Sequence, residues 1–100
     1  MIDLAYLSAK TGDEFALLRG KHEDILVHGT RTRCYFTGEL EERLKKHKYK
    51  LICHSHPGEE TPVSSLDDRV MLRTIEQEKS CIISARTGKT TSFSAHDYET

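Results

Sequence analysis

The segment from Tyr49 to His56 has the composition of a strand, and the short connection to the helix after it restricts how this chain can fold. Side chains alternate between two faces along a strand. One face therefore carries Ile52, His54 and His56, and the other carries Leu51, Cys53 and Ser55. Both imidazoles are expected to point the same way.

A helix is predicted soon after this strand. Residues 58–63 read as a loop, after which Ser64 or Ser65 can cap a helix that runs to about Lys79. Asp67 falls in the first turn of that helix. Because the loop is short, the helix can direct Asp67 back towards the end of the strand.

The rest of the chain alternates strands with one further helix. The patterns predict a hairpin over 14–19 and 25–29, a solvated amphipathic helix over 38–47, and a second hairpin over 80–85 and 90–94. The apolar run 25–27 is typical of a strand covered on both sides, and residues 4–7 fit either a strand or a helix turn. The order predicts an α/β fold with a single mixed β-sheet and packed helices, in one domain over residues 1–100.

Composition excludes several classes of protein. The 100 residues carry a formal net charge of -1, so we expect no nucleic-acid partner and no attraction to an anionic membrane. The start of the chain lacks the basic and apolar regions of a signal peptide, and no apolar run could span a bilayer, so we expect a cytoplasmic protein. Three cysteines without a CxxC pair predict reduced thiols at Cys34, Cys53 and Cys81.

Two histidines and an aspartate at this spacing suggest a metal site. His54, His56 and Asp67 offer the nitrogen and oxygen ligands of a zinc ion that keeps one coordination position open. Such an ion lowers the pKa of water to about 7 and polarises a carbonyl, which favours peptide or amide hydrolysis. A carboxylate must also carry the proton and a donor must stabilise the oxyanion, and Glu14 and Ser64 are the candidates.

The spacing also resembles a known signature. His54-Ser55-His56-Pro57, six further residues and then Ser64-x-x-Asp67 are similar to the HxHP-to-SxxD motif of the JAMM (MPN) metallopeptidase family. The resemblance spans roughly residues 12–95 and includes an upstream Glu followed by Leu-Leu-x-Gly-Lys. This chain is similar to the short bacterial and phage forms of the family.

The resemblance implies a deaminase-like, three-layer fold and a metal-dependent activity. It implies Zn²⁺ held by His54, His56 and Asp67, with Ser64 contacting the tetrahedral intermediate and Glu14 as general acid/base. Family members cut peptide or isopeptide bonds at the C-terminus of ubiquitin and ubiquitin-like proteins. The implied partner is therefore a protein substrate, with ubiquitin-like proteins among the candidates.

The choice of the general base stays open at this point. The family usually shows Glu-x-x-Gly before the apolar pair, whereas Gly20 lies one residue too early for Glu14, and Asp13 aligns if Gly20 is the anchor. Glu14 is favoured because it is longer and lies in the strand, while Asp13 suits the turn after Gly12.

Other interpretations of these residues compete with a peptidase. The chain could be a non-catalytic MPN-like scaffold or partner-binding module with structural or absent zinc. A Ser-His-Asp triad is disfavoured because no Gly-x-Ser-x-Gly surrounds Ser64, and Cys53 is expected to face away from His54. Glu59 and Glu60 lie in the loop and are assigned no chemical role. The oligomeric state is left open.

Overall fold

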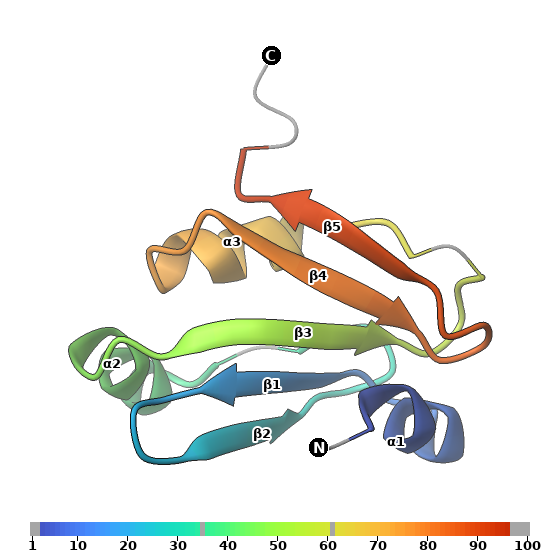
Figure 1. Ribbon diagram of the computed structural model, residues 1–100, viewed down its shortest axis with the longest axis horizontal. Coiled ribbons are helices and arrows are strands. Elements are labelled where there is room, and N and C mark those ends of the chain that lie inside the picture. The colour runs from blue at the N-terminus through green and yellow to red at the C-terminus, as the bar shows by residue number, and fades with distance from the viewer. Residues whose placement is uncertain (1–2, 35, 61, 97–100) are drawn as a thin grey trace.

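One mixed five-stranded sheet organises this protein, whose computed structural model describes residues 3–34, 36–60 and 62–96. The strands are β1 (Phe15–Arg19), β2 (Asp24–His28), β3 (Lys50–His56), β4 (Lys79–Ser84) and β5 (Thr90–Ser94). Their order across the sheet is β2-β1-β3-β4-β5 (Figure 1). Only β3 and β4 run parallel, since the other neighbours pair antiparallel. The predicted α/β class with a single mixed sheet and both predicted hairpins are confirmed.

Three described helices cover the two faces of this sheet: α1 (Leu4–Thr11), α2 (Gly38–Lys46) and α3 (Leu66–Thr74). Figure 1 shows α1 in front of the sheet and α3 behind it. Residues 4–7, which fitted two interpretations, are helical because Asp3 caps them by accepting a hydrogen bond from the Tyr6 amide. The helix predicted to reach Lys79 is shorter, because Glu76 takes a left-handed conformation with φ of 58° and Lys79 begins β4.

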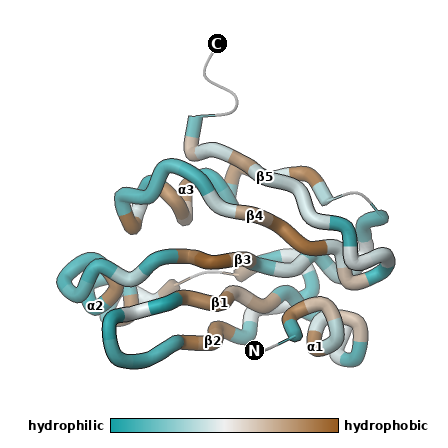
Figure 2. The backbone as a smooth tube through the Cα atoms, viewed as in Figure 1, coloured by the Kyte–Doolittle hydropathy of each residue, from teal (hydrophilic) through white to brown (hydrophobic). Residues whose placement is uncertain are grey.

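The two faces of the sheet bury separate apolar clusters. Leu44 of α2 and Met71 and Leu72 of α3 pack on one face, and Leu4 of α1 packs on the other. Figure 2 shows the apolar segments concentrated in the central strands. Residues 15–18 of β1 are buried throughout, whereas β2 alternates between exposed and half-buried positions at the sheet edge. The expectation that residues 25–27 are covered on both sides is wrong. The β1–β2 hairpin places β1 inside the sheet and leaves β2, which contains these residues, at the edge.

A β-bulge in β3 decides which side chains share a face. The pairing with β1 shifts between Leu17, opposite Cys53, and Leu18, opposite Leu51, so that Ile52 is the extra residue. Leu51 therefore packs in the same core cluster as α2 and α3, whereas Ile52 is partly exposed. The predicted alternation is wrong at these two positions and right from Cys53 onward.

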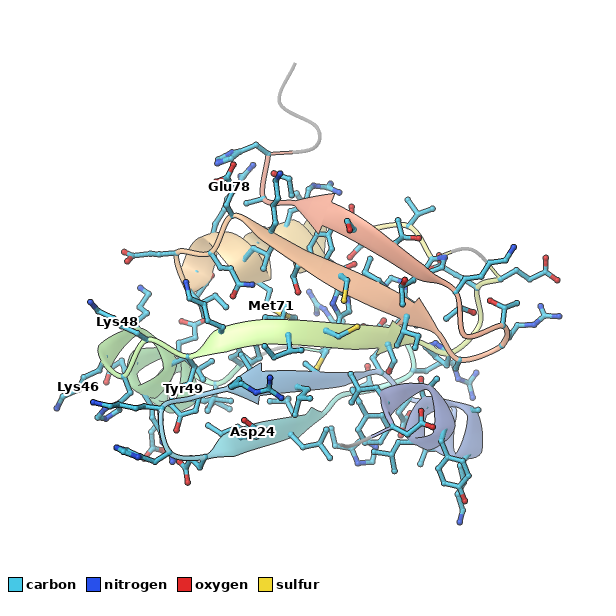
Figure 3. All side chains as sticks on the ribbon, viewed as in Figure 1. Asp24, Lys46, Lys48, Tyr49, Met71 and Glu78 are labelled. Atoms are coloured by element: carbon cyan, nitrogen blue, oxygen red, sulfur yellow. The ribbon has the colours of Figure 1, made fainter. Side chains whose placement is uncertain are left out.

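The turn between β1 and β2 packs against the start of β3. The hydroxyl of Tyr49 donates a hydrogen bond to Glu23, which also pairs with Arg43 of α2. A Cβ atom at Gly20 would overlap the Tyr49 ring, so a glycine is needed for this close approach. Figure 3 shows Tyr49 beside this turn. Among the residues that the structure describes, no helix has the length and apolar character to cross a membrane.

Candidate metal centre

Four buried side chains converge at one end of the sheet. Glu14, His54, His56 and Asp68 each offer a ligand atom, and these atoms all lie within 4.8 Å of one another. Glu14 precedes β1, the histidines belong to the end of β3, and Asp68 lies in the first turn of α3. This group could hold a metal ion, because imidazole and carboxylate groups are common ligands of divalent metals.

The aspartate of the group is held by the cap of α3. Ser65 is the N-cap, and its side chain accepts a hydrogen bond from the Asp68 amide at 3.2 Å. Asp68 Oδ2 in turn accepts from the Ser65 amide at 2.8 Å, which completes a capping box. The box fixes the carboxylate at the helix start, where Oδ1 lies 2.9 Å from Nε2 of His54 and Oδ2 lies 3.2 Å from Nε2 of His56.

Asp67, the predicted metal ligand, is not part of this group. Its side chain is 55% exposed and forms an ion pair with Arg33 at 3.2 Å. The segment Ser64-Ser65-Leu66-Asp67-Asp68 contains two overlapping Ser-x-x-Asp patterns. Because the helix is capped by Ser65 rather than Ser64, Asp68, one residue after the predicted Asp67, is the aspartate that faces the histidines.

Glu14, rather than Asp13, is the acid that the fold brings to the histidines. The Glu14 amide donates to the carbonyl of Thr30 at 2.7 Å, and its carbonyl accepts from Gly29 at 2.8 Å. Asp13 is instead paired with His28, with Oδ2 and Nε2 2.8 Å apart. The backbone pairing therefore orients Glu14 into the buried group.

Gly29 allows the loop after β2 to hold Glu14 in this way. A Cβ atom at Gly29 would overlap the carbonyl oxygen of Arg33 and would lie 2.9 Å from Cα of Cys34. The loop folds back on itself at this point, since Thr30 also donates its amide to Arg33 at 2.7 Å. A glycine is required here for close backbone approach rather than for an unusual φ.

Burial and mutual contact shift the pKa values of this group. Burial raises the pKa of Glu14 to about 7, although nearby His56 opposes this shift. Burial alone would lower the pKa of His56, but the carboxylate of Asp68 outweighs it and raises that pKa to about 9. Burial also opposes ionisation of Asp68, yet the two imidazoles hold the pKa of that carboxyl far below its usual range. The group thus favours a negative Asp68 and a positive His56.

Hydrogen bonding is incomplete at the ring nitrogens of the two buried histidines. Nε2 of both histidines and Nδ1 of His54 are buried and make no hydrogen bond in the described part of the chain. The two Nε2 atoms lie close to Asp68, but these contacts do not have the geometry of a hydrogen bond. Buried polar atoms in this state are unusual in a folded protein. They mark the position at which a ligand would satisfy them.

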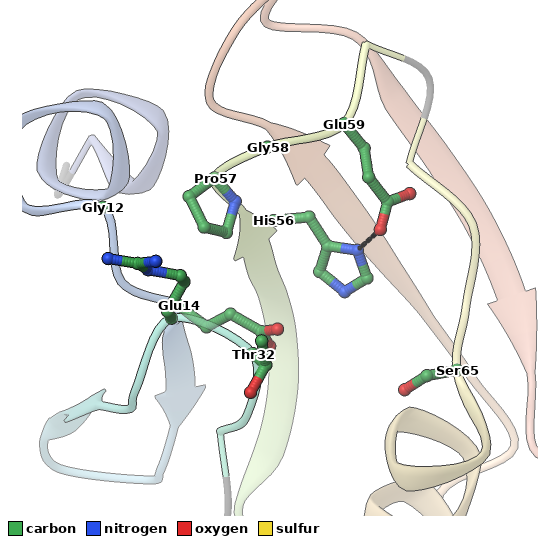
Figure 4. A pocket seen from close by; sticks show the side chains of 9 residues that line it. Gly12, Glu14, Thr32, His56, Pro57, Gly58, Glu59 and Ser65 are labelled. Carbon is green, nitrogen blue, oxygen red and sulfur yellow. Dashed lines mark hydrogen bonds and ion pairs between the residues drawn. The ribbon is translucent and has the colours of Figure 1, made fainter.

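Glu59 orients His56 from the loop that follows β3. Its Oε1 lies 2.8 Å from Nδ1 of His56, and its Oε2 accepts from the Val63 amide at 2.9 Å (Figure 4). The Glu59 carbonyl also accepts a hydrogen bond from the Ser84 hydroxyl of β4. No role had been predicted for Glu59. The only signal in the sequence is its position three residues after His56, in a loop where many side chains are solvated.

An open cavity of about 510 Å³ lies beside the group. Glu14, His56, Glu59 and Ser65 line it together with the loop after β2, and Figure 4 shows their side chains around the same space. Ser64, the predicted catalytic serine, is not among the described lining residues. Its side-chain oxygen accepts instead from Nη1 of Arg69 at 3.2 Å.

Comparison of the chain with protein-family profiles, with curated proteins and with solved structures gives no match.

Proposed function

We propose that this protein is a zinc-dependent hydrolase of JAMM type that cleaves a peptide or isopeptide bond at the C-terminal tail of a ubiquitin-like or other protein. The observation that carries the proposal is the buried group Glu14, His54, His56 and Asp68 beside an open cavity. A buried set of ligands at a cavity wall combines a closed side, which holds an ion, with an accessible side, which admits a substrate.

The donor atoms suit zinc. Two ligands of one tetrahedral zinc ion are separated by about 3.4 Å, given bonds of about 2.1 Å. The oxygens of Asp68 lie 2.9 and 3.2 Å from the two Nε2 atoms, close to that separation. His54, His56 and Asp68 would hold the ion. The ion would in turn bind ring nitrogens that otherwise lack hydrogen bonds. Bound zinc would activate water for attack and polarise the scissile carbonyl.

Glu14 is suited to move the proton of this reaction. With a pKa of about 7 it can accept a proton and return it at neutral pH, which is the condition for efficient general acid–base catalysis. Its carboxylate lines the cavity and belongs to the same buried group as the histidines. Glu14 would therefore take the proton of the attacking water and return it to the leaving amine.

Ser65 is our candidate for stabilising the developing oxyanion. Its oxygen accepts from the Asp68 amide, and its hydroxyl still has a hydrogen to donate. It lines the cavity, whereas Ser64 contacts Arg69. We therefore transfer the role predicted for Ser64 to Ser65.

The proposal is tested with zinc-loaded protein and a panel of ubiquitin-like C-terminal amides, with turnover and bound zinc measured on the same samples. We expect about one zinc per chain and measurable cleavage. Glu14→Gln should keep the zinc and lower turnover by about 10²–10⁴-fold. His56→Ala should lose both. Wild-type protein that takes up no zinc at neutral pH would overturn the proposal.

A non-catalytic binding module is the second candidate, favoured by one observation. Asp68 lies within 3.2 Å of an Nε2 atom of each imidazole, and Glu59 contacts the outer nitrogen of His56, so both rings have carboxylate neighbours without a metal. In that case zinc removal should leave the unfolding midpoint unchanged, and no conjugate in the panel should be cleaved.

A further inference from the structure

Two cysteines lie next to each other on the parallel strands β3 and β4. The register pairs His54 with Ile82, and Cys53 and Cys81 are the residues immediately before this pair. The thiol of Cys81 reaches across to the carbonyl oxygen of Ile52, 3.3 Å away, and Ile52 precedes Cys53. The two thiols also interact with each other.

Both thiols lie on the face of the sheet that α1 covers. Cys53 packs against the cluster of Leu4, Phe15 and Leu17, and Ile83 packs there as well. Because alternate residues of a strand share a face, Cys81 is on the same side as Ile83. The thiols are therefore separated from the candidate metal centre, whose histidines point to the opposite face.

We propose that Cys53 and Cys81 form a reversible intramolecular disulfide when the protein meets a peroxide, so that this pair is an oxidative modification site. Neighbouring strands lie about 4.8 Å apart, within the range of about 4.4–6.8 Å between the Cα atoms of disulfide-bonded cysteines. Side chains at adjacent positions on one face need only a rotation of the thiols to meet.

The surroundings of the three cysteines make Cys81 the first to react. Cys81 is half-buried and hydrogen bonding with Cys53 lowers its pKa to about 7, so a thiolate is available near neutral pH. Cys34 is buried, and burial raises its pKa to about 12. Oxidation should therefore select the strand pair and leave Cys34 as a thiol.

The reaction uses one peroxide for each pair. The Cys81 thiolate attacks a peroxide oxygen and the O–O bond breaks, which gives a Cys81 sulfenic acid and hydroxide. The hydroxide takes up the proton that the Cys81 thiol released on ionising and becomes one water. The sulfur of Cys53 then attacks the sulfenic sulfur, the S–O bond breaks, and the departing hydroxide takes the Cys53 proton as a second water. The two thiols lose two electrons and two protons, and the peroxide gains them.

The disulfide would close a loop that carries most of the candidate metal centre. His54, His56 and Asp68 all lie between Cys53 and Cys81 in the chain. Closing this loop restricts the unfolded chain, so the oxidised protein should unfold at a higher denaturant concentration than the reduced protein.

The experiment treats the full chain with hydrogen peroxide, blocks remaining thiols, and digests it with trypsin without reductant. We expect the intact mass of the peroxide-treated chain to fall by two hydrogens. We also expect the digest to contain one new linked pair of peptides, Leu51–Arg69 with Ser80–Arg86. Dithiothreitol should restore the separate peptides.

Two variants serve as controls. Cys34→Ser should form the same link, because Cys34 is buried away from the pair. Cys81→Ser should abolish the link and leave Cys53 as a thiol at the same peroxide dose. The proposal is overturned if both thiols of the wild-type protein survive, if Cys81 is oxidised alone, or if disulfides form only between chains.

Discussion

Oδ1 of Asp68 lies 2.9 Å from Nε2 of His54, and both side chains are almost completely buried. This contact joins the first turn of α3 to the end of β3, two segments separated by a loop. It makes Asp68 the carboxylate that completes a possible metal site with the two histidines, while Asp67 points to Arg33 at the surface.

Exchanging each aspartate separately tests this arrangement. We expect Asp68→Asn to weaken zinc binding by at least about 100-fold, because a ligand contributes more than the groups that merely support ligands. Asp67→Asn should leave zinc affinity within about twofold, since it removes only an exposed ion pair. Competition with a chromophoric chelator measures both affinities. The opposite ranking would return the ligand role to Asp67.

Glu59 should affect zinc affinity without binding the metal. Glu59→Ala removes the acceptor at Nδ1 of His56, and such supporting groups contribute about 10–100-fold to metal affinity. The matched control is Glu60→Ala, which removes the same charge from an exposed side chain that pairs with Arg86 at 3.8 Å. Isothermal titration with zinc distinguishes them. Equal losses in both variants would indicate a general charge effect instead.

The stability of the metal-free protein should fall as pH rises from about 4.5 to 7, and above pH 7 the loss at His56 is opposed by Cys81, whose pKa the folded state lowers from 9.0 to about 7. The folded state raises the pKa of Glu14 from 4.5 to about 7 and that of His56 from 6.5 to about 9, so it binds more protons than the unfolded chain over this interval. The contribution of His56 is complete below pH 6.5 and is lost as pH rises through about 9. Urea unfolding of chelator-treated protein at several pH values measures the trend.

The affinity for zinc should depend on pH in the opposite direction to the stability of the metal-free protein. Binding must displace a proton from His56, so the apparent zinc affinity should increase with pH up to about 9 and binding should release protons. Titration in two buffers of different ionisation enthalpy measures the proton release. An affinity that is flat between pH 6 and 9 would contradict the assigned protonation of His56.

The close backbone approach at Gly29 should make this glycine sensitive to substitution. Gly29→Ala places a methyl group against the Arg33 carbonyl and Cα of Cys34, and we expect a loss of about 1–3 kcal/mol in the free energy of unfolding. Gly38→Ala is the matched control, because nothing lies within 4 Å of its added Cβ and the residue is helical. Chemical denaturation compares them. A neutral Gly29→Ala would show that the loop relaxes freely.

Ser65 should contribute to stability as well as to the site. Ser65→Ala removes the N-cap of α3 and should cost about 1 kcal/mol, whereas Ser64→Ala removes only a contact with Arg69 and should cost less. If Ser65 also stabilises the oxyanion, its variant should lower the turnover of zinc-loaded protein and keep the zinc. Thermal unfolding and the cleavage assay report the two effects separately.

The strand and helix pattern could be predicted because it is encoded locally. Both hairpins, the helix over 38–46 and the shared face of His54 and His56 follow from alternation and helical spacing within short windows. The bulge at Ile52 could not be predicted in this way, because it depends on how β3 pairs with a strand far away in the sequence. Local periodicity contains no information on that register.

The candidate site likewise combines features that local sequence predicts with features that only the tertiary structure sets. From the sequence, two imidazoles on one strand and a nearby Ser-x-x-Asp pattern indicated a possible metal site, since residue types and spacing are enough to suggest ligands. Only the tertiary structure selected Asp68 over Asp67, brought Glu14 rather than Asp13 to the histidines, and joined Glu59 to His56. These choices depend on the cap of α3, the backbone pairing around Gly29 and the path of the loop after β3. Each is a contact between segments that must fold together before the position of its side chain is defined.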